Sequence, residues 1–166
     1  MKTKTINLYT LDELTEVAKE KAREWYKEGN DYRDLLDEMN EELHVLLKEH
    51  GMKGDDVEVF YSLSYCQGDG AMFVGRVQWK SYTADIKQSG HYYHENSKSY
   101  SLVSTKTDKE ASEKAYADFE NLYVNICNTL EKKGYEYIEY ENSDESVDDN
   151  IMANDYTFTG EGKREN

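Results

Sequence analysis

Two short segments carry the side chains that could do chemistry. One is residues 66–70, Cys-Gln-Gly-Asp-Gly, which brings a thiol, an amide and a carboxyl group close together. The other is residues 91–94, His-Tyr-Tyr-His, in which two imidazoles lie three positions apart. Groups of these types would suit a metal site, a cysteine nucleophile with a histidine base, or a small polar binding site.

A metal shared by His91 and His94 requires both side chains on one face. Positions three apart share a face on a helix but point to opposite faces on a strand, and the flanking residues are strand-like. A zinc site also needs several converging ligands, and no Cys-x-x-Cys motif is present to add them. We therefore expect both histidines to be ordinary polar and packing residues, with no bound metal or cofactor.

Residues 66–70 are interpreted first as a hairpin turn. A glycine on each side of Asp69 permits backbone conformations that are closed to other residues. A second interpretation stays open, in which the turn presents Gln67 and Asp69 beside the two histidines as a polar site. Cys66 could be a nucleophile only as a thiolate with a neighbouring base, which one of the histidines would supply.

The common catalytic and ligand-binding motifs are missing from the sequence. There is no Walker loop, no Gly-x-Gly-x-x-Gly, no Gly-x-Ser-x-Gly and no His-Glu-x-x-His. Residues 144–150 are acidic, but they lack the central glycine and the alternating ligands of an EF-hand. The sequence therefore predicts a protein that is not an enzyme.

The negative charge of the chain is concentrated near its C-terminus. The formal net charge is −15, and residues 136–166, with 10 acidic and 2 basic side chains, contribute −8 of it. This charge disfavours direct binding to nucleic acid or to anionic membranes, and it favours a partner with a basic surface. The acids expected to contact that partner are Asp144, Glu145, Asp148 and Asp149, with their side chains exposed. The alternative is a purely solubilising surface.

The chain is rich in tyrosine, with 15 Tyr among 166 residues. Disordered chains are poor in aromatic residues, so a folded domain is expected despite the high charge. Tyrosine is also frequent in protein interfaces, because it is amphipathic and stiff. We therefore expect Tyr92 and Tyr93 to join the acidic residues in partner binding.

Hydrophobic periodicity predicts an α+β fold built on an antiparallel meander of about four strands. Apolar residues alternate in the middle of the chain and recur every three or four positions on either side of it. Capping pairs at Thr10 with Glu13 and at Thr107 with Glu110 indicate two helix starts, and Gly134 indicates a helix end. We expect helices at 11–28, 32–50 and 108–133, the first two as an αα-hairpin, and strands at 57–65, 71–79, 82–88 and 92–104. Further expectations are a strand at 5–9, an extended segment at 135–140, a helix from a Ser143 cap to about 153, and a last strand at 156–158.

The length of the chain suits one domain, so we expect a single domain over 1–166 that frays after about 160. The two cysteines, Cys66 and Cys127, are too few for a disulfide scaffold, and we expect both as reduced thiols. The N-terminus lacks the apolar core of a signal peptide, and no apolar run approaches the roughly 18 residues of a membrane helix. We expect a cytoplasmic protein.

Four blocks in order along the chain carry a family resemblance. They are AKEKAREWY at 18–26, QGDGA at 67–71 with Phe73 and Gly75, SGHYYHE at 89–95, and a C-terminal block at 143–160. These blocks resemble a group of small acidic proteins encoded by tailed phages and prophages, some of which are labelled antitoxins of a toxin–antitoxin stability system. The chain is shorter than their pattern between Lys80 and Thr83.

This resemblance implies a phage-encoded protein that acts in the cytoplasm of a bacterial host. Small acidic phage proteins without catalytic motifs often inhibit host machinery, and some imitate the charge of DNA. The leading hypothesis is therefore a non-enzymatic inhibitor of a bacterial nucleic-acid-handling defence protein, as an anti-CRISPR or similar anti-defence factor would be. The alternatives are an antitoxin-like protein that neutralises a basic toxin, and a small ligand- or metal-binding domain that uses Gln67, Asp69, His91 and His94.

Overall fold

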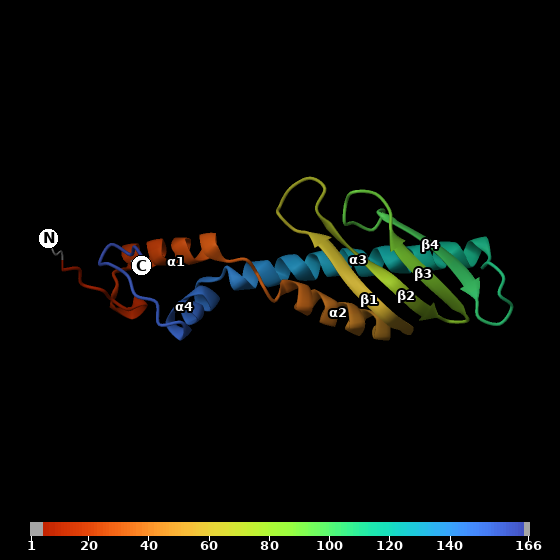
Figure 1. The fold of residues 1–166 in the computed structure, drawn as a ribbon, viewed down its shortest axis with the longest axis horizontal. Coiled ribbons are helices and arrows are strands. Elements are labelled where there is room, and N and C mark those ends of the chain that lie inside the picture. Colours follow the sequence, from red (N-terminus) through yellow and green to blue (C-terminus); the bar gives the residue numbers. More distant parts are fainter. Residues whose placement is uncertain (1–4, 165–166) are drawn as a thin grey trace. The chain divides into compact units, whose positions relative to one another are not determined.

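A computed structural model describes residues 5–164 (Figure 1). The described chain divides into two compact units, which we call the terminal unit (residues 5–33 and 137–164) and the central unit (residues 34–136). Helices and an antiparallel sheet are both present, which confirms the α+β class. The single domain over 1–166 stays a prediction. Because α1 (Glu16–Gly29) and α2 (Leu35–Glu49) belong to different units, each helix is described within its own unit.

The central unit contains the predicted meander. The strands β1 (Met52–Ser62), β2 (Gly70–Trp79), β3 (Tyr82–Gln88) and β4 (Lys98–Ser104) lie in sheet order β1-β2-β3-β4, and every neighbouring pair is antiparallel (Figure 1). The predicted strand at 92–104 starts too early, because residues 89–97 form a loop. The loop is closed by the Ser89 amide, which donates to the Ser97 carbonyl at 2.8 Å.

Helix α3 (Glu113–Glu141) covers one face of this sheet and contributes much of the core. Phe119 packs against Trp79 with ring centroids 5.5 Å apart, and Tyr123 packs against Phe73 at 4.6 Å. The Tyr123 hydroxyl donates to the Phe73 carbonyl at 2.8 Å and accepts from the Phe73 amide at 3.3 Å. The most buried apolar side chains of the central unit come from α2, the sheet and α3: Met39, Leu43, Leu47, Val59, Ala71, Met72, Phe73, Val77, Ala84, Ile86, Leu102, Phe119, Tyr123, Ile126, Cys127 and Leu130.

Both predicted boundaries of this long helix are wrong. The Thr107 and Glu110 capping pair does not start it, since residues 109–111 instead pair with the outer edge of β4, and Ser112 caps the helix through its hydroxyl. Nor does Gly134 end it, so the predicted extended segment at 135–140 is helical up to Glu141. A Cβ at Gly134 would overlap Leu63 Cδ1 and lie 3.2 Å from Met39 Sδ. The glycine therefore permits close packing and does not stop the helix.

Two other predicted helices start late for local reasons. Thr10 and Glu13 do form a capping box, but it begins only the 3-10 turn η1 (Leu11–Glu13), and Leu14 then adopts an extended ψ of 154°. Helix α1 therefore begins at Glu16 and not at 11. Helix α2 begins at Leu35, because Tyr32 has a φ of 46°, which is outside the right-handed helical region.

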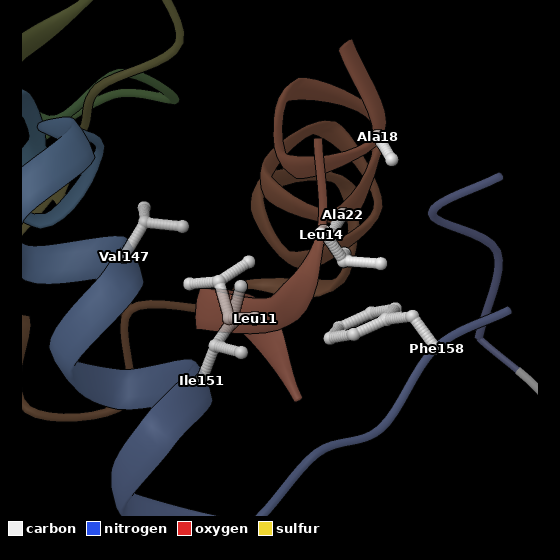
Figure 2. Packing of buried hydrophobic residues seen from close by; sticks show 7 residues of the cluster. All are labelled: Leu11, Leu14, Ala18, Ala22, Val147, Ile151 and Phe158. Atoms are coloured by element: carbon white, nitrogen blue, oxygen red, sulfur yellow. The ribbon is translucent and has the colours of Figure 1, made fainter. Parts of the chain in front are cut away.

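The terminal unit is held by a small apolar cluster. Figure 2 shows side chains from η1, α1, α4 (Asp144–Ala153) and the C-terminal segment pointing toward one another. The buried members are Leu11, Leu14, Ala18, Ala22, Val147, Ile151 and Phe158. The predicted Ser143 cap of α4 is confirmed, since its hydroxyl accepts from the Ser146 amide at 3.2 Å.

The two short strands expected in the terminal unit are reduced to isolated bridges. Tyr9 and Phe158 exchange two backbone hydrogen bonds, of 2.8 and 2.9 Å, and Phe158 also bridges to Arg164. The remaining residues of 5–9 and 156–158 form no ladder among the described residues. The fraying predicted after about 160 stays a prediction, and residues 165–166 lie outside the described part of the chain.

Gly75 is the glycine whose conformation the sheet requires. Its φ is 117°, and a Cβ there would overlap the Asp56 carbonyl oxygen and lie 2.8 Å from Val57 Cα, at the bulge of β1. We predict that Gly75→Ala lowers the free energy of unfolding by roughly 3 kcal/mol or more, from the clash and the unfavourable φ together. Urea unfolding followed by circular dichroism measures this loss.

Gly90→Ala is the matched control. Gly90 has a φ of 97° but nothing within 4 Å of an added Cβ, so it reports the cost of the backbone conformation alone, about 1 kcal/mol. Equal losses in the two variants would contradict the close approach of β1 at Gly75.

Candidate functional site

The loop between β1 and β2 (residues 63–69) and the loop between β3 and β4 (residues 89–97) lie in contact in the central unit (Figure 1). We call these two segments the two-loop tip. A Cβ at Gly70 would lie 2.5 Å from His94 Cβ and 3.1 Å from the Tyr93 carbonyl, and the Tyr92 ring lies 3.4 Å from the corresponding position at Gly68. The structure thus brings together the two polar segments that the sequence singled out.

Asp69 organises the first loop from inside. Its carboxylate accepts hydrogen bonds from the Ser64 amide at 2.7 Å, the Cys66 amide at 3.0 Å, the Ser64 hydroxyl at 3.0 Å and the Tyr135 hydroxyl of α3. The Tyr135 hydroxyl, followed by the backbone amides, holds the pKa of Asp69 well below its usual range. Burial, followed by the bond to Asp69, raises the pKa of Tyr135 to about 12, so its hydroxyl stays a donor. Asp69 is therefore a structural acceptor and a poor general base.

Cys66 is exposed at this turn, and its sulfur lies 3.1 Å from the Ser64 hydroxyl and 3.3 Å from Asp69 Oδ1. Within residues 5–164 its hydrogen-bond partners include no histidine nitrogen. The expected histidine base is therefore not hydrogen-bonded to the Cys66 thiol in the described part of the chain. Gln67 is exposed beside it, and no hydrogen bond of its side chain is recorded in the described chain.

The two histidines of the second loop face different surroundings. His91 is exposed, whereas His94 is half-buried and stacks on the Tyr92 ring with centroids 5.9 Å apart and an interplanar angle of 14°. Among the described residues, no three His, Cys, Asp or Glu side chains lie close enough to hold a metal ion. The absence of a metal stays a prediction, and packing accounts for the position of His94.

Large aromatic side chains extend from both loops toward solvent. Tyr65 is 66% exposed although its ring packs on Tyr135 at 4.6 Å, and Tyr92 is 61% exposed. Tyr93, which was expected at the interface, is half-buried and stacks on Phe60 with ring centroids 5.6 Å apart. It therefore packs the loop against β1 and offers little exposed surface to a partner. Sequence reasoning did not include Tyr65 among the partner-binding residues. Its position next to Cys66 at the end of an alternating strand was the signal that could have found it.

The predicted acidic residues lie on α4 of the terminal unit, and two of the four are engaged within the chain. Arg23 of α1 binds Asp148 through two hydrogen bonds of 2.7 Å, which leaves the Asp148 side chain 26% exposed, contrary to the expected exposure. Asp144 pairs with Lys27 at 3.1 Å and with Arg23 at 3.4 Å. The bond to Asp148 is the main reason why the pKa of Arg23 is raised.

Glu145 and Asp149 are the two acids of α4 that remain exposed and available. Neither has an ion pair within residues 5–164. Sequence reasoning could not separate these two from Asp144 and Asp148, because the pairing partner is more than a hundred positions away. Asp144 and Asp148 therefore form ion pairs within the terminal unit, whereas Glu145 and Asp149 form none among the described residues.

Comparison of the chain with protein-family models, with curated proteins and with solved structures finds no match. The family resemblance of the sequence blocks accordingly stays a prediction. Across residues 5–164, no helix has both the length and the apolar character needed to span a membrane.

Removing the Tyr135 hydroxyl should disturb the Asp69 turn. We predict that Tyr135→Phe raises the pKa of Asp69 toward its ordinary value, because the largest cause of the depression is gone. A carboxyl group with a depressed folded pKa stabilises the fold above its unfolded pKa of about 3.9 and loses that contribution as the pH falls through the folded value. In the variant this contribution should therefore be smaller, and its loss should be complete at a higher pH than in the parent.

Carbon-detected NMR titration of the Asp69 side-chain carboxyl measures the shift. Tyr92→Phe is the control, since no hydrogen bond of the Tyr92 hydroxyl is recorded among the described residues. An Asp69 pKa that is the same in Tyr135→Phe as in the parent would show that Tyr135 does not hold the turn.

Proposed function

We propose that this chain is a phage-encoded, non-enzymatic inhibitor that binds a bacterial defence protein whose surface is basic because it handles nucleic acid, as an anti-CRISPR or similar anti-defence factor does. The observation that carries the proposal is the two-loop tip, where two ordered loops expose the large aromatic side chains Tyr65 and Tyr92.

The tip has the properties of a protein-binding surface. Interfaces depend on a few large aromatic anchors held in place before binding, because a side chain that is already ordered loses less entropy. Tyr65 is positioned by the ring of Tyr135, and Tyr92 by stacking on His94. The internal hydrogen bonds of Asp69 use its carboxylate within the turn and weigh against the alternative of a small-ligand site.

The charge of the chain favours a basic partner. The net charge of −15 attracts positively charged surfaces and speeds their association at low salt. Glu145 and Asp149 are available for this on α4, whereas Asp144 and Asp148 already form ion pairs with Arg23 and Lys27. A basic channel that normally holds nucleic acid is the kind of surface on which such charges would compete with phosphates.

The tyrosines provide the first test. The chain is immobilised, incubated with a nuclease-treated bacterial lysate, and the retained protein is purified for affinity measurement. We predict that Tyr65→Ala and Tyr92→Ala each weaken binding by roughly tenfold or more, as truncation of an aromatic anchor does. Tyr140→Ala is the matched control, because Tyr140 is 62% exposed in the terminal unit and outside the tip.

Nucleic acid should release the captured partner, because both ligands would occupy its basic surface. A partner that binds all three alanine variants equally, or that is retained in the presence of excess nucleic acid, would contradict the proposal.

The free acids provide the second test. We predict that Glu145→Lys with Asp149→Lys slows association with the same partner and flattens its salt dependence, because steering is screened within a Debye length of about 8 Å. Stopped-flow association rates between low and physiological salt measure the effect, and folding should be retained.

Asp144→Lys with Asp148→Lys makes the same change of charge and serves as the comparison. It places lysines against Arg23, so we expect lower stability of the terminal unit in addition to slower association. If the Glu145 and Asp149 variant associates as fast as the parent at low salt, the acidic end is only a solubilising surface.

A further inference from the structure

The outer edge of β4 has one covered half and one open half. At the covered half, the Ser104 amide donates to the Lys109 carbonyl at 2.8 Å and the Ala111 amide donates to the Leu102 carbonyl at 2.9 Å. The Leu102 amide donates to the Tyr116 hydroxyl of α3 at 2.9 Å. Residues 109–111 thus form a short antiparallel addition to the sheet, which ends at Leu102.

The register places the backbone groups of Lys98 and Tyr100 on the open half. Ser97 bonds to Ser89 toward β3, so alternate residues of β4 from Ser99 onward direct their backbone groups to β3. Tyr100 and Lys98 then face outward, in phase with Leu102. No hydrogen bond of the Tyr100 amide or carbonyl is recorded within residues 5–164, and the same holds for the backbone of Lys98.

A groove lies along this open half, between the strand edge and α3. It has a volume of about 430 Å³ and is lined by Asn96, Lys98, Ser99, Tyr100, Tyr116 and Glu120. Tyr116 lies at the end of the groove toward the covered half, where its hydroxyl accepts the hydrogen bond from the Leu102 amide. The site therefore combines free backbone donors and acceptors with an aromatic and acidic wall.

The polar side chains that line the groove are held by hydrogen bonds, and Glu120 can still accept further ones. The Lys98 side chain is 5% exposed, and its ammonium donates to the Glu95 carbonyl at 2.6 Å and to Glu120 Oε1 at 2.7 Å. The Tyr100 hydroxyl donates to Glu120 Oε2 at 2.9 Å, and burial raises its pKa, so it stays a donor. Glu120 is still 41% exposed, and a carboxylate has more lone pairs than these two bonds use.

We propose that this groove binds an extended basic peptide segment as an added antiparallel strand, with an arginine or lysine side chain directed at Glu120. Strand addition takes its affinity from main-chain hydrogen bonds and its specificity from alternate side chains. The peptide residue opposite Tyr100 would exchange two hydrogen bonds with it, and its side chain would lie on the same face as that of Tyr100. On that face the side chain would meet Glu120 and the Tyr116 ring of α3, both of which can bind a cation.

Charge selects this occupant over a second copy of the chain. The central unit has 19 acidic and 11 basic side chains, a net charge of −8, so two copies repel each other. Glu113 lies one turn before Tyr116 on α3 and adds a second exposed acid near that end of the groove. The covered half shows that this edge accepts an antiparallel segment. The proposal does not involve Tyr65 or Tyr92, the two exposed anchors of the two-loop tip, so either proposal can fail without the other.

The probe is a synthetic peptide, acetyl-Thr-Val-Arg-Val-Arg-Thr-amide, titrated into the full-length ¹⁵N-labelled protein. We expect amide shifts at Lys98, Tyr100 and Leu102, with slower hydrogen exchange at Lys98 and Tyr100. Methylating the amide nitrogens of the two arginines should weaken binding by about tenfold or more, because these nitrogens would donate to β4. Methylating the valine nitrogen between the arginines should leave binding unchanged, because it points away from β4.

Glu120→Gln should weaken the same peptide by about tenfold through loss of the charge-assisted contact. Asp118→Asn is the matched control, since Asp118 is exposed on α3 but half a turn away from Tyr116 and Glu120. The proposal is overturned if the peptide causes no shifts at 98–102 up to millimolar concentration, if both methylated peptides bind alike, or if an all-glutamate peptide binds as well.

Discussion

The two hydrogen bonds between the Tyr123 hydroxyl and the Phe73 backbone allow β3 to separate from β2 in the middle of the sheet. Strand β3 pairs with β2 only from Gly75 onward, so the half of β2 that includes Phe73 has β1 as its single strand neighbour. A buried strand residue with unpaired backbone groups would be costly. The Tyr123 hydroxyl takes the place of the missing strand by both donating to Phe73 and accepting from it, and burial keeps the pKa of that hydroxyl high.

This divergence explains why the two loops meet. Because β3 separates from β2 beyond the Gly75–Ile86 pair, residues 89–97 can lie beside the start of β2, where the absence of a side chain at Gly70 leaves room for His94. Helix α3, which hydrogen-bonds the Phe73 backbone through Tyr123, also carries Tyr135, whose hydroxyl donates to Asp69 in the loop between β1 and β2. Helix α3 therefore stabilises both the open seam of the sheet and the turn that carries Tyr65, and its uninterrupted passage through Gly134 makes this possible.

The parts of the fold that could be predicted are those set by local pattern. Alternation indicated β2 and β3, the Ser143 hydroxyl indicated the start of α4, and short turns made the meander antiparallel, which in turn puts the two loops at one end of the sheet. The errors arise where a distant contact overrides a local signal. Gly134 lies inside the helix, where its lack of a side chain leaves room for Leu63 and Met39, and Thr107 is no helix cap because residues 109–111 pair with β4. Likewise, the structural role of Asp69 depends on Tyr135, and the neutralisation of Asp148 depends on Arg23, neither of which is near in sequence.

Both outer strands of the sheet are protected against unlimited lateral growth. On β1, a bulge with Asp56 at a φ of 52° interrupts the edge, and the Val59 amide is taken by the Asn40 side chain of α2 at 3.0 Å. On β4, residues 109–111 occupy half of the edge. Repetitive stacking into cross-β fibrils requires a long, flat and uncharged edge, and this protein offers none across its described residues. A protein whose β4 edge is open only at Lys98 and Tyr100, among the described residues, could remain dispersed at high concentration while still admitting one short strand there.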